Sequence, residues 1–258
     1  FRDKRSTSGF FQREVQTHST GDRVQRIRNP FSDDGSFRWW LFAFSIFLGA
    51  YLLFQLEPLI GKFILPWFGG SPAVWTTCML FFQILLLAGY AYAHFSLDRL
   101  TPPQQGLIHI TLLALALLTL PIAPSVSWKP DDSTQPTLSI LMLLLASVGL
   151  PFFVLSATSP LMQAWFVRVC PGRSPYALYA LSNLGSFLAL LSYPFAFEPY
   201  FKLSEQTLGW SLGFGLFTVV CGGLALDFRR KAQAGEIIAT PTLVDDEIRL
   251  ADQLPSGL

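Results

Sequence analysis

The stretch FQLEPLIGKFILPWFGG, residues 54–70, decides how this chain must fold, because it sets charges and prolines beside a long apolar run. The eighteen residues before Glu57 carry no charged side chain. An α-helix needs about 20 mostly apolar residues to cross a bilayer. We therefore expect a spanning helix that ends near Leu56 and leaves Glu57 at the water boundary.

The second half of the same stretch predicts a separate, short helix. Pro58 cannot continue the hydrogen bonding of the first helix, but it suits the first turn of a new one. One side of that helix is apolar and consists of Leu59, Ile60, Phe63, Ile64 and Trp67. We expect it to lie flat at the membrane interface, with Trp67 in the aromatic belt and Lys62 elsewhere on its surface.

The composition of the whole chain is typical of an integral membrane protein. Of 258 residues, 51% are hydrophobic and 14% are charged, whereas a soluble domain carries about 25% charged residues. The sequence divides into a polar, basic N-terminal segment (1–38), a transmembrane domain (39–228) and a C-terminal tail (229–258). A net charge of +1 and the lack of a basic, aromatic-rich groove argue against nucleic acid as a partner.

Six apolar segments predict an all-α, multi-pass fold with short interfacial helices. They cover residues 39–56, 72–96, 106–122, 137–155, 175–197 and 208–228. Two of them begin with a serine followed by proline, Ser71-Pro72 and Ser174-Pro175, a pattern that caps a helix and starts its first turn.

The distribution of lysine and arginine predicts the orientation. With the N-terminus in the cytoplasm, fifteen of the eighteen basic residues lie in cytoplasmic segments. The external loops hold only Lys62, Lys129 and Lys202. Cytoplasmic loops carry such an excess of basic residues. We therefore expect the cytoplasmic (inner) membrane of a cell, with both termini in the cytoplasm.

The motif around Glu57 has a second copy. The pattern F-x-x-E-P recurs at residues 195–199, where Glu198 precedes a proline, and Lys202 follows it as Lys62 follows the first copy. Both copies are expected at the outer surface. The match is compatible with an internal duplication, a device known in transporters.

Small and polar residues in the last two spans predict helix packing. Ser182, Gly185, Ser186 and Ala189 form one small-residue stripe, and Gly209, Gly213, Gly215, Gly222 and Gly223 are spread along the final span. Such residues allow close approach of helices in lipid. Asn183 and Gln83 are interpreted as interhelical hydrogen-bonding residues, with contact to a substrate as the alternative.

The segment SATSPLMQAWF, residues 156–166, has two interpretations. One is an amphipathic helix on the cytoplasmic surface, anchored by Trp165 and Phe166. The other is a broken or re-entrant helix, in which hydroxyl groups and Gln163 satisfy the backbone groups that Pro160 frees.

Few residues are suited to catalysis or to a cofactor. His94 and His109 end one span and begin the next, the arrangement of a pair of metal or haem ligands, but nothing else supplies a second shell. The three cysteines share no metal-ligand spacing. Since no catalytic or phosphate-binding motif is present either, we expect no enzyme activity, no metal and no cofactor. The candidate binding residues are Glu57, Lys62, Trp67, Gln163, Asn183 and Glu198, all in interfacial or helix-packing positions.

Three long phrases resemble a bacterial family. FQLEPLIGKFILPWFGGSPAVWTTCMLFFQILLLAGYAYAH, LSATSPLMQAW and GRSPYALYALSNLGSFLALLSYPFAFEP are similar to the N-terminal membrane region of fused major-facilitator/spermidine-synthase-like proteins. The resemblance covers about residues 40–228. It implies a helical membrane fold, further spans and a soluble synthase-like domain. The thirty residues after Phe228 contain no glycine-rich loop, so no catalytic residue is carried over.

Three functions follow as hypotheses. The first is a non-catalytic subunit that packs through its helices and tails in a larger membrane complex, such as a respiratory or photosynthetic one, with lipid and other membrane proteins as partners. The second is a transporter-like half of a major-facilitator body. The third is the membrane anchor of a spermidine-synthase-like enzyme.

Overall fold

The computed structural model describes residues 33–124, 136–170 and 173–237, and within these ranges the secondary structure is helical without a strand. The elements are α2 (Asp33–Phe68), α3 (Pro72–Arg99), α4 (Pro102–Leu117), α5 (Pro136–Leu144), η2 (Leu145–Gly149), α6 (Leu150–Val169), α7 (Tyr176–Ser192), η3 (Tyr193–Phe197) and α8 (Leu203–Gln233). The predicted tails at 1–32 and 238–258 lie outside the described residues.

Within the described ranges, five helices are long and apolar enough to cross a membrane. They are Ser36–Phe68, Pro72–Arg99, Thr137–Val169, Tyr176–Phe197 and Leu203–Gln233. The all-α, multi-pass prediction is confirmed at that level. The predicted third span differs: α4 starts earlier, at Pro102, and stops at Leu117 after 16 residues. At about 1.5 Å per residue it is about 24 Å long, and Pro121 lacks the N–H that would continue it.

The predicted break after Glu57 is wrong. Helix α2 runs without interruption through Pro58 and Pro66 to Phe68, so no separate interfacial helix forms. The reason is packing: Leu59, Ile60 and Ile64 are at most 1% exposed in the core of the bundle. The apolar side of this segment therefore faces protein, and burial holds the helix together despite the hydrogen bonds that proline removes.

Both interpretations of residues 156–166 are also wrong. The segment belongs to α6, which continues from α5 through the single π-helical turn η2. The combined helix Thr137–Val169 extends well beyond the predicted end at Leu155. Trp165 and Phe166, expected as surface anchors, are fully buried.

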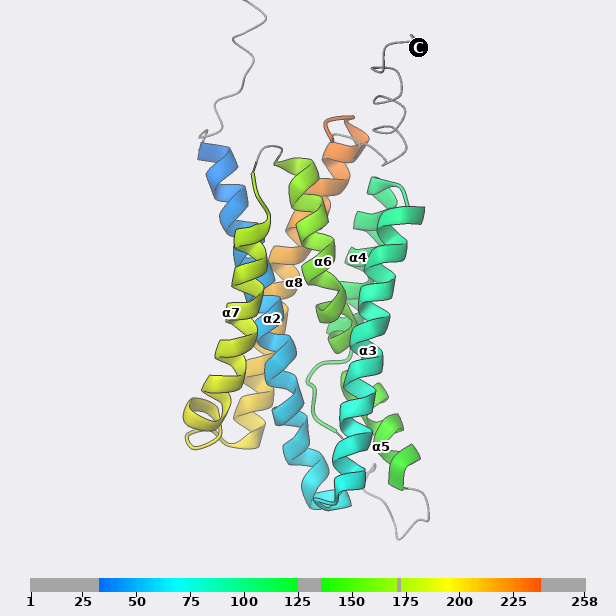
Figure 1. Ribbon diagram of the computed structural model, residues 1–258, viewed down its shortest axis with the longest axis vertical. Coiled ribbons are helices and arrows are strands. Elements are labelled where there is room, and N and C mark those ends of the chain that lie inside the picture. Colours follow the sequence, from blue (N-terminus) through cyan, green and yellow to red (C-terminus); the bar gives the residue numbers. More distant parts are fainter. Residues whose placement is uncertain (1–32, 125–135, 171–172, 238–258) are drawn as a thin grey trace, which may run out of the picture.

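Successive helices alternate in direction along the bundle, as Figure 1 shows. The start of α2 and the end of α8 consequently lie at the same end, the upper end in Figure 1. The end of α3, the end of α6 and the start of α7 lie there too. The opposite end holds the α2–α3 corner and the connection from η3 to α8.

The packing of the helices has a two-fold pattern. Helix α2 packs on α7 and α8, and α6 packs in the same way on α3 and α4; α2 also contacts α6, and α4 contacts α8. If α2, α3 and α4 are exchanged with α6, α7 and α8, in that order, the main contacts between helices are therefore reproduced. Because α2 and α6 run in opposite directions (Figure 1), the pattern is that of an inverted repeat. It pairs α2 with α6, so the F-x-x-E-P match between α2 and the end of α7 is not part of it.

Small residues make the closest helix contacts, as predicted for α7. A methyl group on Gly185 would lie 2.6 Å from the Phe47 carbonyl oxygen of α2, and one on Gly106 would lie 2.8 Å from the Ala225 carbonyl oxygen of α8. Most glycines of α8 behave differently. Gly209, Gly215, Gly222 and Gly223 have no atom within 4 Å of that position and face away from the bundle.

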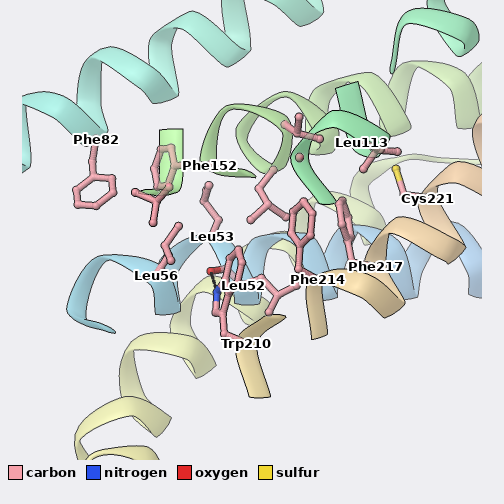
Figure 2. Close-up of a cluster of buried hydrophobic side chains, with 14 of the residues drawn as sticks. Leu52, Leu53, Leu56, Phe82, Leu113, Phe152, Trp210, Phe214, Phe217 and Cys221 are labelled. Atoms are coloured by element: carbon pink, nitrogen blue, oxygen red, sulfur yellow. Dashed lines mark hydrogen bonds between the residues drawn. The ribbon is translucent and has the colours of Figure 1, made fainter. Parts of the chain in front are cut away.

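Aromatic and aliphatic side chains fill the centre of the bundle. Figure 2 shows Trp210, Phe214 and Phe217 of α8 beside Leu52, Leu53 and Leu56 of α2. The Trp210 indole donates a hydrogen bond of 2.9 Å to the Leu52 carbonyl oxygen. This core fixes α2 at the middle of the bundle, from where it borders the cavity described next.

Candidate functional site

A cavity of about 460 Å³ lies between α2, α3, α6 and α7. The α2 side is apolar and includes Ile46, Leu53 and Phe54. The other side is polar, and its polar residues are Tyr90 of α3, Ser156, Thr158, Ser159 and Gln163 of α6, and Tyr179, Ser182, Asn183 and Ser186 of α7. None of the lining residues is charged, and none is histidine or cysteine.

Local backbone structure explains why so many hydroxyl groups are tolerated here. Thr158 donates a 2.7 Å hydrogen bond to the Val154 carbonyl oxygen, and Ser186 donates a 3.1 Å bond to that of Ser182. A Ser or Thr hydroxyl within a helix can bond in this way to the carbonyl one turn earlier. These two hydroxyls are thereby satisfied within their own helices.

One further hydrogen bond connects α6 and α7 beside the cavity, and a second supports it from within α6. Ser159 of α6 and Ser182 of α7 are 3.2 Å apart at their hydroxyl oxygens. Gln163 donates from its amide nitrogen to Ser159 at 3.1 Å. The predicted residue Gln163 therefore bonds within α6 and supports Ser159, which makes the link to α7, while the side-chain oxygen of Gln163 accepts no hydrogen bond among the described residues.

Asn183 borders the same cavity but forms no hydrogen bond among the described residues. Its side chain is exposed on α7, as are those of Tyr90, half exposed, and Tyr179, 59% exposed. The predicted interhelical hydrogen bond of Asn183 is not formed with any described helix of this chain, so a partner in another protein stays a prediction; Gln83 on α3 is likewise exposed. The polar side of the cavity therefore opens outward from the bundle.

The remaining predicted residues gather at the opposite end of the bundle from the termini of α2 and α8. Lys62 of α2 and Glu198, just after η3, form an ion pair of 3.0 Å, and the ammonium of Lys62 also lies 5.8 Å from the centre of the Tyr193 ring. The two F-x-x-E-P copies thus meet through the lysine of one and the glutamate of the other. Trp67 packs edge-on against Phe63, with ring centres 6.5 Å apart. Glu57 forms no ion pair among the described residues.

The two histidines do not meet as a ligand pair. His94 is 81% exposed and contacts Asp98 at 3.3 Å on its own helix. His109 is fully buried, with Nε2 3.6 Å from the sulfur of Cys221. The described ranges contain no cluster of three or more potential metal-ligating side chains.

Sequence reasoning selected Gln163 and Asn183 but did not predict the cavity that both residues line. Ser182 and Ser186 were interpreted only as packing residues, and the tyrosines of the cavity were not selected. Their spacing carries the signal: residues 179, 182, 183 and 186 follow one another at the interval of a helix face. Comparisons with models of known families, with curated proteins and with solved structures found no match for this chain.

Proposed function

We propose that this chain is a non-catalytic, six-helix membrane body. It packs against a second membrane-protein body over the open side of the cavity, where Tyr90 of α3 and Tyr179 and Asn183 of α7 are exposed. The observation that carries the proposal is the open polar side of the cavity. In hydrocarbon, a polar group without a partner costs free energy. Asn183 and the Tyr90 and Tyr179 hydroxyls have no such partner among the described residues, so a neighbouring protein that covers them removes this cost.

The inverted packing pattern supports a partner of similar architecture. Major-facilitator transporters consist of two six-helix halves, each built from inverted three-helix repeats. The four helices that border the cavity here, α2, α3, α6 and α7, are the first two long helices of each repeat. We propose α4 as the sixth, short span, which places both termini on one side of the membrane.

The basic residues favour the cytoplasmic side of the cytoplasmic membrane for both termini. Among the described residues, seven lysines and arginines belong to the end of the bundle that holds the start of α2 and the end of α8: Arg38, Arg99, Arg168, Arg173, Arg229, Arg230 and Lys231. The other end holds Lys62 and Lys202. This asymmetry follows the positive-inside rule.

Purification from native membranes in mild detergent tests the proposal. We expect a membrane protein to co-purify with the wild-type chain and to be identified by mass spectrometry. Asn183→Trp, which projects a bulky ring from the polar side, should reduce the recovered partner at least fivefold. Leu216→Trp, on the exposed face of α8 and away from the cavity, is the matched control and should recover it fully. A wild-type chain that runs as a monodisperse monomer would contradict the proposal.

Transport is the second candidate, and the size and chemistry of the cavity favour it. A volume of about 460 Å³ is within the range of sites for small molecules. Since the lining carries no charge, the solute should be uncharged. Uptake of a panel of uncharged solutes into proteoliposomes, compared between the wild type and Gln163→Leu, distinguishes this function from a purely structural one.

A further inference from the structure

A second cavity, of about 230 Å³, lies between the last third of α2 and the start of α3. Its walls are apolar and come from Ile60 and Ile64 of α2 and from Trp75, Met79 and Phe82 of α3. Only two titratable side chains line it, the carboxylate of Glu57 and the thiol of Cys78. It thus combines one acidic group with apolar walls that are open on the side of Trp75 and Met79.

Glu57 has no partner that accounts for its position. Among the described residues it forms neither an ion pair nor a hydrogen bond, and Lys62, five residues further along α2, is bound to Glu198. Glu57 itself is half-buried. A carboxylate in apolar surroundings is costly unless a cation or a hydrogen-bond donor meets it.

The walls provide a surface for an apolar cation. The Trp75 indole lies close to α2 at Gly61, where an added methyl group would be 3.4 Å from Cη2 of the ring. Phe82 is held in place by Phe152 of α6, at 4.9 Å between ring centres, and Figure 2 shows the two rings side by side. The face of an indole attracts an ammonium group through its π electrons, and the sulfur of Met79 is polarisable.

We propose that the cavity formed by Glu57, Trp75 and Phe82 binds a small organic ammonium, with the Glu57 carboxylate as its counter-ion. A divalent metal ion fits less well, because calcium and magnesium require six or more oxygen ligands and the cavity offers one carboxylate. An ammonium needs only that carboxylate, while its carbon substituents fill the apolar part. The ligand is either a free alkylamine or the amine of a lipid headgroup.

The position of Glu57 along α2 is consistent with both a free alkylamine and a lipid headgroup amine as the ligand. Residues 39–56 are uncharged and span about 27 Å as a helix, close to the about 30 Å of a hydrocarbon core. In the orientation proposed above, Glu57 follows directly at the outer boundary of the hydrocarbon. The headgroup amines of zwitterionic lipids lie beside this boundary, and so do amphiphilic amines from the external solution.

The test uses phenethylammonium as the probe and 2-phenylethanol as its neutral analogue of the same shape. The full chain is reconstituted in phosphatidylglycerol nanodiscs, and binding is measured by isothermal titration calorimetry. We expect saturable binding of phenethylammonium, at least tenfold weaker binding to Glu57→Gln, and no saturable binding of the alcohol. Asp98→Asn, which removes a carboxylate from the far end of α3, is the matched control and should bind as the wild type does.

A second variant tests the shape of the cavity without changing the charge of Glu57. Gly61→Leu keeps the carboxylate but fills the cavity, so it should also bind at least tenfold more weakly while its thermal unfolding midpoint stays near that of the wild type. Equal affinity in wild type, Glu57→Gln and Gly61→Leu would overturn the proposal, as would equal affinity for the alcohol and the amine. Since none of these readings depends on a partner protein, they also distinguish its failure from that of the proposed function.

Nanodiscs of phosphatidylethanolamine identify the source of the ligand. If the probe binds at least fivefold more weakly in them than in phosphatidylglycerol, the headgroup amine competes for Glu57 and is the natural ligand. If the affinity is the same in both lipids, the site selects a free amine. Both results require the carboxylate, and Glu57→Gln should abolish any difference between the two lipids.

Discussion

At the scale of single residues, Gln105 shows how one buried polar side chain can join two helices through specific hydrogen bonds. The indole of Trp165 is fully buried, and its N–H donates a hydrogen bond of 3.0 Å to the side-chain oxygen of Gln105. The amide nitrogen of Gln105 in turn donates to the Leu100 carbonyl oxygen at 2.9 Å. One buried glutamine thus satisfies a donor on α6 and an acceptor at the end of α3.

Gln105→Leu should lower the free energy of unfolding by about 2 kcal/mol, because it leaves the Trp165 N–H without a partner in an apolar environment. The measurement is unfolding in mixed micelles, followed by tryptophan fluorescence. Trp165→Phe in the same background removes the orphaned donor. The second substitution should therefore cost at least about 1 kcal/mol less there than in the wild type. Strict additivity of the two changes would argue against this hydrogen bond.

At the scale of helices, close backbone contact holds α7 against α2. Gly185→Ala should destabilise the protein by about 2 kcal/mol, since a methyl group 2.6 Å from the Phe47 carbonyl oxygen forces the two helices apart. Gly209→Ala is the control within the same bundle, because nothing lies within 4 Å of the added methyl group. It should stabilise α8 by up to about 1 kcal/mol through higher helix propensity. Thermal unfolding of both variants in one detergent is the measurement. The unfolding midpoint should fall for Gly185→Ala and rise for Gly209→Ala.

The Lys62–Glu198 ion pair connects the last part of α2 to the segment after η3. Its side chains are 29% and 48% exposed, so we expect it to contribute at most about 1 kcal/mol. Lys62→Glu should lower the unfolding midpoint by placing two carboxylates together. The double exchange Lys62→Glu with Glu198→Lys should restore most of the loss. If the exchange gives no recovery, the pair makes no measurable contribution.

The sequence predicted those helix boundaries that local residues determine, but not those that depend on burial by distant segments. The start of α3 at the Ser71 cap and the close packing of Gly185 on α7 follow local rules, and these predictions are confirmed. The second predicted cap, Ser174, is wrong, because α7 starts at Tyr176 after Pro175. The continuations through Pro58 and Pro160 depend on contacts from distant segments, which bury Ile60 and Trp165 completely. Local proline rules pointed the other way because they contain no information about that burial.

The candidate site shows the same division. Glu198 and Lys62 were selected because both belong to a repeated motif, but only the fold brings α2 and the end of α7 together. The polar cavity was missed because its lining comes from four helices. Each helix alone contributes a few hydroxyl groups that look like ordinary packing residues.

For the whole molecule, the proposed orientation can be tested with single cysteines. In Cys78→Ser/Cys221→Ser, the remaining Cys170 lies at the basic end of the bundle, so a membrane-impermeant maleimide should label it only from the cytoplasmic face. Ser204→Cys, added in a background without Cys170, should be labelled only from outside.

Burial raises the pKa of the Cys170 thiol, which lowers its thiolate fraction at neutral pH. Its labelling rate should therefore keep rising at pH values where a free cysteine has levelled off.

The unbroken course of α2 from Ser36 to Phe68 has a mechanical consequence for the surrounding lipid. A helix of 33 residues is about 50 Å long, well beyond the thickness of the acyl-chain layer. Its final third stays helical because protein surrounds it, so it needs no match to the bilayer. If residues 39–56 lie in the hydrocarbon, the remainder of α2 extends beyond it, so the length of this helix does not restrict the protein to a bilayer of one thickness.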